Sequence, residues 1–294
     1  MDQIPFQCRD LLRRHALDGF GTSIAICNCL YGAQAAYNED FAAALCRAVN
    51  DWLVEEWLAR DPRLRASIVV PLQSVELAVA EIERRASDVR FVQVLVLAMG
   101  DAPLGRRMYW PIYAAAERYG LPIGIHAGSS YRFAPTALGW PSYYIEDYAC
   151  QSQAFQAQVM SLVAEGVFTK YPGLHVVLIE YGVSWLPALM WRSQKLWRSL
   201  RHEVPWLDQS PPEIIREHIR LTIQPFDGPS DPRQFDRLLN QIGSEEMLLF
   251  STDYPHWQFD GGAALPEGIG PDLAHKILRE NPLRTYPRLK ESMS

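Results

Sequence analysis

The regular alternation of short apolar segments with longer helical patterns constrains the fold of this chain more than any other feature. The apolar segments are rich in β-forming residues on both faces, as expected of strands buried between helices. Seven segments have this character: Ser23–Cys29, Ala66–Leu72, Phe91–Ala98, Pro122–His126, His175–Tyr181, Ile219–Gln224 and Met247–Asp253. Because strands that alternate with helices over short connections form parallel βαβ units, the sequence predicts an α/β fold.

The length of the chain fits one large barrel. The sequence has 294 residues, of which 48% are hydrophobic, and a (β/α)8 barrel typically needs about 250 residues. We see no internal repeat or linker, so we expect a single domain over 1–294 with an irregular lead-in at 1–22 that includes a short helical piece, Arg9–Leu17. A closed TIM-type barrel has eight strands, and the strand that is missing here would come before Ser23. We therefore predict a barrel that lacks its first strand.

Composition limits the partners of the protein. A net charge of −6 argues against a phosphate-binding surface, and so against nucleic acid. The N-terminus has no apolar core of a secretory signal, and no apolar run approaches membrane-spanning length. An odd count of five cysteines without a close-spaced framework favours a reducing compartment. We expect a cytoplasmic protein that binds a small molecule.

Three polar side chains come at the carboxyl ends of predicted strands. Asp253 follows an apolar run, and Pro255 cannot donate to a strand ladder, so pairing should stop there. His126 and Glu180 end two other strands in the same way. Since ligands bind at this end of parallel sheets, we interpret His126 and Asp253 as metal ligands that converge from different strands. Glu180 is either a general base, a metal ligand or an ion-pair partner of Arg192.

Further residues near these strand ends are candidates for supporting roles. We expect His256, three residues beyond Asp253, to orient that carboxylate or to close the loop. Arg132 can hold a substrate carboxylate as a bidentate fork, although a solvated loop arginine is the commoner case. Aromatic side chains that should line an apolar pocket are Trp140, Tyr144, Trp185 and Trp257.

Taken together, these residues resemble the amidohydrolase-related family typified by aminocarboxymuconate-semialdehyde decarboxylase (the amidohydrolase 2 group). The resemblance runs from about Asp18 to the C-terminus. The segments that carry it are RAVNDWLVEEWLARDPRLRASIVVP, PLGRRMYWPIYAAAERYGLPIGIHAG, GWPSYYIEDY, GVFTKYPGLHVVLIEYGVSWLPALMWR and LLFSTDYPHW. The resemblance implies a metal-dependent (β/α)8 barrel that either hydrolyses esters, lactones or amides, or decarboxylates aromatic and unsaturated acids.

The match makes His126 the metal-binding histidine of the middle strand and Asp253 the metal-facing aspartate of the last strand. The sequence departs from the family pattern at two positions. Glu180 stands where decarboxylase members carry a catalytic histidine, and Gln194 replaces an aspartate common in relatives. A third departure is more serious. The family carries two metal ligands, as His-x-His, on its first strand, and this sequence lacks that strand. The chain is thus a shortened copy of an enzyme, a protein with a rebuilt ligand set such as His126, Asp253 and Glu180, or one that has lost metal chemistry.

The first functional interpretation is a metal-dependent hydrolase, with a metal-activated water and with Asp253, Glu180 and His256 as catalytic residues. The alternatives are a non-oxidative decarboxylase and a non-catalytic barrel. For the cofactor we expect one divalent transition metal, with zinc favoured over manganese or iron. An open barrel exposes two sheet edges, so we also expect a homodimer, with Met1–Cys8 as a cover for one edge.

Overall fold

The structure is a computed structural model that describes residues 9–30, 32–128, 132–229, 231–257 and 265–291. Within these residues a single parallel sheet has its strands in chain order. The seven strands are β1 Ala25–Cys27, β2 Leu64–Val69, β3 Phe91–Leu97, β4 Ile123–His126, β5 Val176–Ile179, β6 Ile219–Thr222 and β7 Leu248–Leu249. The predicted TIM-barrel-type fold with seven strands is confirmed.

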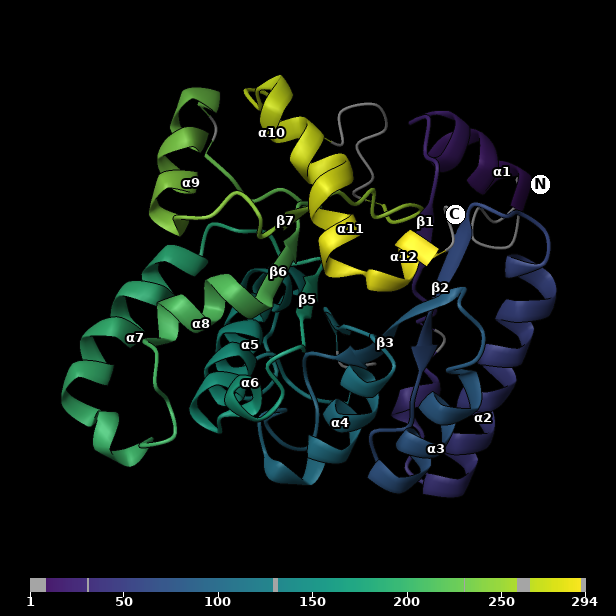
Figure 1. The fold of residues 1–294 in the computed structure, drawn as a ribbon, viewed down its shortest axis with the longest axis horizontal. Helices are drawn as coiled ribbons and strands as arrows, with labels where there is room; N and C mark the ends of the chain where they lie inside the picture. The colour runs from purple at the N-terminus through teal and green to yellow at the C-terminus, as the bar shows by residue number, and fades with distance from the viewer. Residues whose placement is uncertain (1–8, 31, 129–131, 230, 258–264, 292–294) are drawn as a thin grey trace.

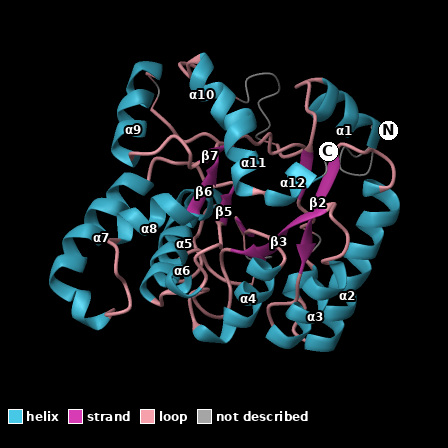
Figure 2. Ribbon diagram, viewed as in Figure 1, coloured by secondary structure: helices cyan, strands magenta, loops and turns pink. Residues whose placement is uncertain are grey.

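Helices surround the strands on the outside of the sheet (Figure 2). Their bounds are α1 Arg9–Leu12, α2 Glu39–Trp52, α3 Val75–Arg85, α4 Trp110–Arg118, α5 Tyr144–Ala164, α6 Val167–Lys170, α7 Leu186–Leu200, α8 Pro211–His218, α9 Phe235–Ile242, α10 Pro271–His275, α11 Asn281–Thr285 and α12 Pro287–Glu291. None of the described helices is both long and apolar enough to cross a bilayer. The single-domain division of the chain stays a prediction.

The strand β7 is much shorter than the predicted Met247–Asp253, because no strand among the described residues pairs with its outer edge. At its inner edge β7 pairs with β6, and the Leu221 N–H donates to the Met247 carbonyl. At its outer edge the Phe250 N–H donates to the Ile277 carbonyl, and Asn281 Nδ2 donates to the Leu248 carbonyl at 2.9 Å. The C-terminal helical segment therefore covers this edge, and the expected homodimer stays a prediction.

The lead-in contains the predicted helical piece, since Arg9–Asp18 is helical through α1 and the helical segment η2 (Arg13–Asp18). It packs against the loop after β7. The Phe20 ring meets the Phe250 ring edge to face at 5.9 Å, and Tyr254 lies edge to face with His15 at 5.8 Å. The expected role of Met1–Cys8 lies outside the described residues.

The C-terminal helices close the opposite end of the sheet (yellow in Figure 1), where the strands begin. Arg288 on α12 donates to the carbonyls of Ala86, Phe91 and Tyr119, all at the amino ends of β3 and β4. The buried Tyr286 hydroxyl donates to Gln93 Oε1 inside the barrel. With the amino ends covered, the carboxyl ends are left to form the site.

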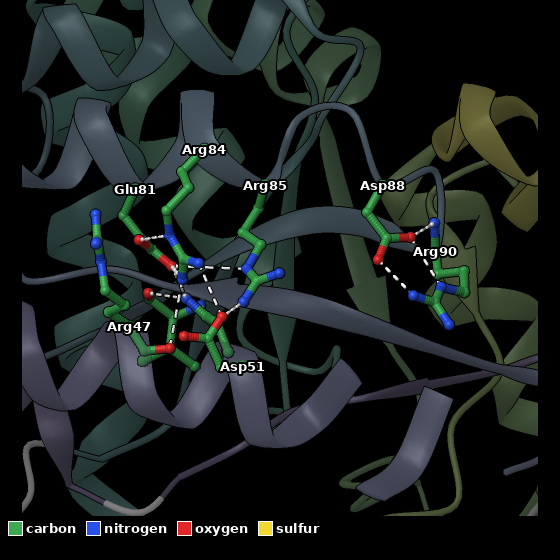
Figure 3. A network of polar contacts seen from close by, with 9 residues as sticks. Arg47, Asp51, Glu81, Arg84, Arg85, Asp88 and Arg90 are labelled. Carbon is green, nitrogen blue, oxygen red and sulfur yellow. Dashed lines mark hydrogen bonds and ion pairs between the residues drawn. The ribbon is translucent and has the colours of Figure 1, made fainter. Parts of the chain in front are cut away.

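A buried polar network ties α2 and α3 to the sheet (Figure 3). Asn50 has no exposed surface. Its Nδ2 donates to the Val69 carbonyl at 2.9 Å and to Glu81 Oε1 at 2.8 Å, and its Oδ1 accepts from the Val69 N–H at 3.0 Å. Arg84 forms a bidentate pair with Glu81 and reaches Asp51 at 2.8 Å. The side chain of Asn50 thus extends the hydrogen bonding of β2 into the helical layer.

We predict that Asn50→Ala lowers the free energy of unfolding by about 2–4 kcal/mol. The substitution leaves both backbone groups of Val69 without their partner, and each unsatisfied buried group costs about 1–3 kcal/mol. Urea denaturation measures the change. Asp51→Ala is the matched control on the same helix, since its carboxylate is 44% exposed and a surface pair contributes at most about 1 kcal/mol. Equal effects of the two substitutions would contradict the role given to Asn50.

Candidate metal and acid–base site

The ends of three strands bring His126, Glu180 and Asp253 together. His126 is the last residue of β4, Glu180 follows β5 directly, and Asp253 follows β7 after a short extended segment. His126 Nε2 lies 3.2 Å from Glu180 Oε2. Glu180, Asp253 and His256 each offer one ligand atom, and these atoms lie within 4.8 Å of one another. The sequence-based grouping of these four residues therefore corresponds to one cluster in space.

The hydrogen bond at the other nitrogen of His126 fixes its tautomer. Nδ1 lies 2.9 Å from the Ala127 carbonyl, and since a carbonyl can only accept, Nδ1 carries the proton. Burial lowers the pKa of His126, which favours the neutral ring. The Nε2 lone pair then faces the Glu180 carboxyl group, an arrangement suited to a shared cation.

The backbone around Glu180 is held in a restricted conformation. Glu180 has φ 69°, in the left-handed region, and its N–H donates to Thr222 Oγ1 on β6 at 2.9 Å. Gly182 follows at φ 61°, where a Cβ would collide with the Asp227 carboxylate that caps the Val183 N–H. Asp253 is also left-handed, at φ 57°. Such conformations cost about 1–3 kcal/mol each and concentrate at functional sites.

The Glu180 and Asp253 carboxyl groups lie close together in a largely buried position. Burial and then the neighbouring Glu180 charge raise the pKa of Asp253 to about 8. Burial also raises the pKa of Glu180. Two carboxylates this close cannot both ionise at neutral pH without a compensating cation. The pair therefore holds either a proton or a positive charge from another source.

His256 lies behind Asp253 and is itself held by a tyrosine. His256 Nδ1 is 3.3 Å from Asp253 Oδ2, and Nε2 is 3.1 Å from the Tyr148 hydroxyl. Tyr148 in turn accepts from the hydroxyl of Tyr144, whose ring is largely exposed. Trp257 packs at 5.5 Å from the His256 ring. The role of His256 in orienting Asp253 stays a prediction.

The other predicted substrate residues lie in different surroundings. Trp185 is buried, and its Nε1 donates to the Tyr181 carbonyl at 2.9 Å, so it helps to hold the start of α7. Trp140 and Trp257 are more than half exposed. Arg132 Nη1 donates to the Ala35 carbonyl at 3.0 Å. The roles of these residues, Tyr144 included, in substrate binding stay predictions.

Two supporting residues were missed by the sequence reasoning, Tyr148 and Thr222. Tyr148 lies on α5, which begins at Tyr144 because the Glu146 carboxylate accepts from the Ser142 and Tyr143 N–H groups. Glu146 three residues after Tyr143 is the signal of this capping box. Nothing in the sequence indicates that the Thr222 hydroxyl would accept a hydrogen bond from the Glu180 N–H.

The cluster fits a divalent transition metal. The donors are the Glu180 and Asp253 carboxylates and an imidazole. The imidazole is that of His256, whose ligand atom lies within 4.8 Å of both carboxylates, or that of His126 beside Glu180. Either set suits zinc, manganese or iron. Two ligands that are each about 2.1 Å from one ion lie about 3.0–3.4 Å apart, and His126 Nε2 and Glu180 Oε2 are separated by 3.2 Å. The buried Asp253 Oδ2 atom has no hydrogen-bond donor of good geometry among the described residues. A metal would also supply the charge that the carboxyl pair needs.

Comparison with known proteins places the chain in a family. A sequence model of the Amidohydrolase family matches residues 9–288. Gamma-resorcylate decarboxylase of Rhodococcus jostii is 28% identical over 247 residues, which cover 76% of this chain and 69% of that protein. The decarboxylase of the same name from a Polaromonas species is 25% identical over 245 residues, 78% of this chain and 72% of that protein.

Solved structures share the fold. An amidohydrolase from Mycobacterium avium subsp. paratuberculosis has a TM-score of 0.78 and 25% identity, and the match covers 96% of this chain and 74% of that chain. A dihydroxybenzoic acid decarboxylase from a Polaromonas species, solved with manganese and 2-nitroresorcinol, has a TM-score of 0.76 and 23% identity over 95% of this chain and 86% of that chain.

These relatives overturn the expectation that the protein is primarily a hydrolase. The curated relatives are decarboxylases, so the runner-up interpretation fits better. A strand-end histidine and aspartate hold a metal equally well for either reaction, and the sequence pattern could not separate the two. The expectation of zinc is not confirmed, since a relative's structure holds manganese. The family model matches almost the whole chain, and the protein belongs to the Amidohydrolase family.

Proposed function

We propose that this protein is a metal-dependent, non-oxidative decarboxylase of a hydroxylated aromatic acid. The observation that carries the proposal is the carboxyl pair Glu180–Asp253, which lies beside His126 at the strand ends. The similarity to gamma-resorcylate decarboxylases over three quarters of the chain supports the same reaction class. The substrate would be a small acid whose ring lies over the carboxyl ends of β4, β5 and β7.

Decarboxylation needs a proton donor and a means of orienting the carboxylate. The bond between the ring carbon and the carboxyl carbon breaks, its electron pair stays on the ring carbon, and that carbon takes a proton as CO2 leaves. With the Glu180–Asp253 pair ionised as metal ligands, His256 is the remaining acid of the cluster. It lies 3.3 Å from Asp253 and would deliver the proton to the ring carbon. Positioned proton transfer of this kind contributes about 10²–10⁴-fold to a rate.

His126, Glu180 and Asp253 would hold the metal. A bound divalent ion supplies Lewis-acid charge that neutralises and orients the substrate carboxylate. His126 contributes a neutral Nε2 donor because Nδ1 is bonded to Ala127. This is the rebuilt ligand set that the sequence allowed, with Glu180 in place of first-strand ligands. Manganese, zinc and iron are all compatible with it.

We predict that the metal-loaded protein releases CO2 from a hydroxybenzoate and that Glu180→Gln and Asp253→Asn lower kcat by about 10²–10⁴-fold. The acids to be tested form a panel that would include 2,6-dihydroxybenzoate and 5-carboxyvanillate. A coupled CO2 assay and chromatography of the phenol measure the reaction. Glu203→Gln, an exposed carboxylate outside the cluster, is the matched control and should retain full activity.

The proposal fails if protein that carries a metal releases no CO2 from any acid of the panel. It also fails if Glu180→Gln is as active as the wild type. Stoichiometric binding of an aromatic acid with no turnover in any variant would instead support the non-catalytic barrel.

We predict that metal affinity rises with pH and levels off above about pH 8. Below the raised pKa of Asp253, at about 8, the metal must displace the shared proton. One displaced proton makes the apparent affinity about tenfold weaker for each pH unit of acidification. Competition titration of Mn²⁺ and Zn²⁺ at pH 6, 7 and 8 measures the slope. Asp253→Asn should bind metal weakly and with a flatter pH dependence; an unchanged slope would count against Asp253 as the site of the shared proton.

A further inference from the structure

A small cavity lies among the loops at the carboxyl ends of the strands, the end of the sheet that also carries the candidate metal site. It has a volume of about 40 Å³ and is lined by Gln34, Gln73, Leu97, Met99, Tyr109 and Arg132, among others. About 10–15 Å³ suffices for one water molecule, so the cavity can take a substituent of a few atoms but not an aromatic ring. Its lining comes from the loops that follow β1, β2, β3 and β4.

The cavity lies one strand away from His126. Leu97 on β3 pairs in register with His126 on β4, and register partners on neighbouring strands point to the same face of a sheet. Leu97 lines the cavity, while His126 faces the carboxyl pair. A molecule over the metal site can therefore extend one substituent into the cavity.

The loop beside the cavity is held by two side chains. Gln73 Nε2 donates at 2.6 Å to the carbonyls of Gln34 and Ala36. Arg132 donates to the carbonyl between them, that of Ala35, and its guanidinium lies 3.7 Å over the Tyr37 ring. Three consecutive backbone carbonyls are thus fixed, and the walls of the cavity are preorganised.

Four polar atoms around this cavity are buried without a partner in the described part of the chain. They are Nε2 and Oε1 of Gln34, Oε1 of Gln73, and Nε of Arg132. Gln34 is only 8% exposed, and a buried amide that makes no hydrogen bond costs about 1–3 kcal/mol. Such a cost in a preorganised cavity is typical of a binding site, where a ligand supplies the missing partners.

The chemistry of these atoms selects the ligand. Two are acceptors, Oε1 of Gln34 and Oε1 of Gln73, and two are N–H donors. A carboxylate has no proton for the acceptors, and an ammonium group has no lone pair for Gln34 Nε2 and would meet the Arg132 charge. A hydroxyl group both donates and accepts, and it fits the volume.

We propose that this cavity binds a ring hydroxyl group of the substrate and so selects hydroxylated aromatic acids over unsubstituted ones. The inference rests on the proposed function for the placement of the ring over the metal site. It assigns Gln34 as a specificity residue, with Gln73 and Arg132 as the side chains that hold the cavity in shape. Gln34 touches the substituent and not the reacting carbon, so its effect is on affinity.

The test measures binding, which does not depend on turnover. Isothermal titration of Mn²⁺-loaded protein would compare benzoate with 2-, 3- and 4-hydroxybenzoate. In the wild type, at least one hydroxylated isomer should bind about tenfold more tightly than benzoate. In Gln34→Met this preference should disappear, while the affinity for benzoate stays within about twofold. Gln241→Met, an exposed glutamine on α9, is the matched control and should keep the preference.

Thermal unfolding of the ligand-free variants separates a lost contact from a lost fold. Because Gln34 makes no side-chain hydrogen bond in the described part of the chain, Gln34→Met should melt at or above the wild-type temperature. Equal binding of all four acids by the wild type would overturn the proposal, as would a hydroxyl preference that persists in Gln34→Met. A preference that depends on Gln34 in a protein that releases no CO2 would support the cavity and reject the decarboxylase.

Discussion

The close contact between the Glu180 and Asp253 carboxyl groups is the interaction on which the site depends. Two acids brought together in a largely desolvated position cost free energy unless a proton or a cation lies between them. The fold maintains that contact, with Glu180 and Asp253 both in left-handed conformations and with Thr222 bonded to the Glu180 N–H. His126 adds a neutral nitrogen to the same point. The close contact of the two carboxyl groups is therefore the source both of the energetic cost of the cluster and of its capacity for chemistry.

The scaffold can carry this cost because its other strand ends and edges are satisfied. Arg288 closes the amino ends of β3 and β4, and Asn281 covers the outer edge of β7. Asn50 links β2 to α3 with no exposed surface. The open edge expected from seven strands is thus partly occupied by the chain's own C-terminal segment. A sheet with one strand fewer than a closed barrel still presents its carboxyl ends in one rigid array.

The sequence predicted the elements and the cluster well, because both depend on local patterns. His126, Glu180 and Asp253 each end an apolar run, and parallel strands align their carboxyl ends. The strand β7 was predicted too long because an apolar run does not reveal whether a pairing partner exists. The contact of Tyr148 with His256 joins residues 108 positions apart, and no periodicity encodes it. Hydrolysis and decarboxylation could not be separated, since the same ligand types serve both reactions.

The orphaned atoms of Gln34 and the paired acids Glu180 and Asp253 are sites of the same physical kind. Each is a buried polar group whose partner the described residues do not fully supply, and each lies among neighbours that are hydrogen-bonded to the backbone. The two sites differ in what they would accept: the acid pair takes a positive charge or a proton, and the cavity takes a neutral donor and acceptor. Leu97 and His126 are adjacent in register, so both demands act on one ligand. An aromatic acid meets them with its carboxylate at one site and a hydroxyl group at the other, and the spacing between the two sites then selects the position of the hydroxyl on the ring.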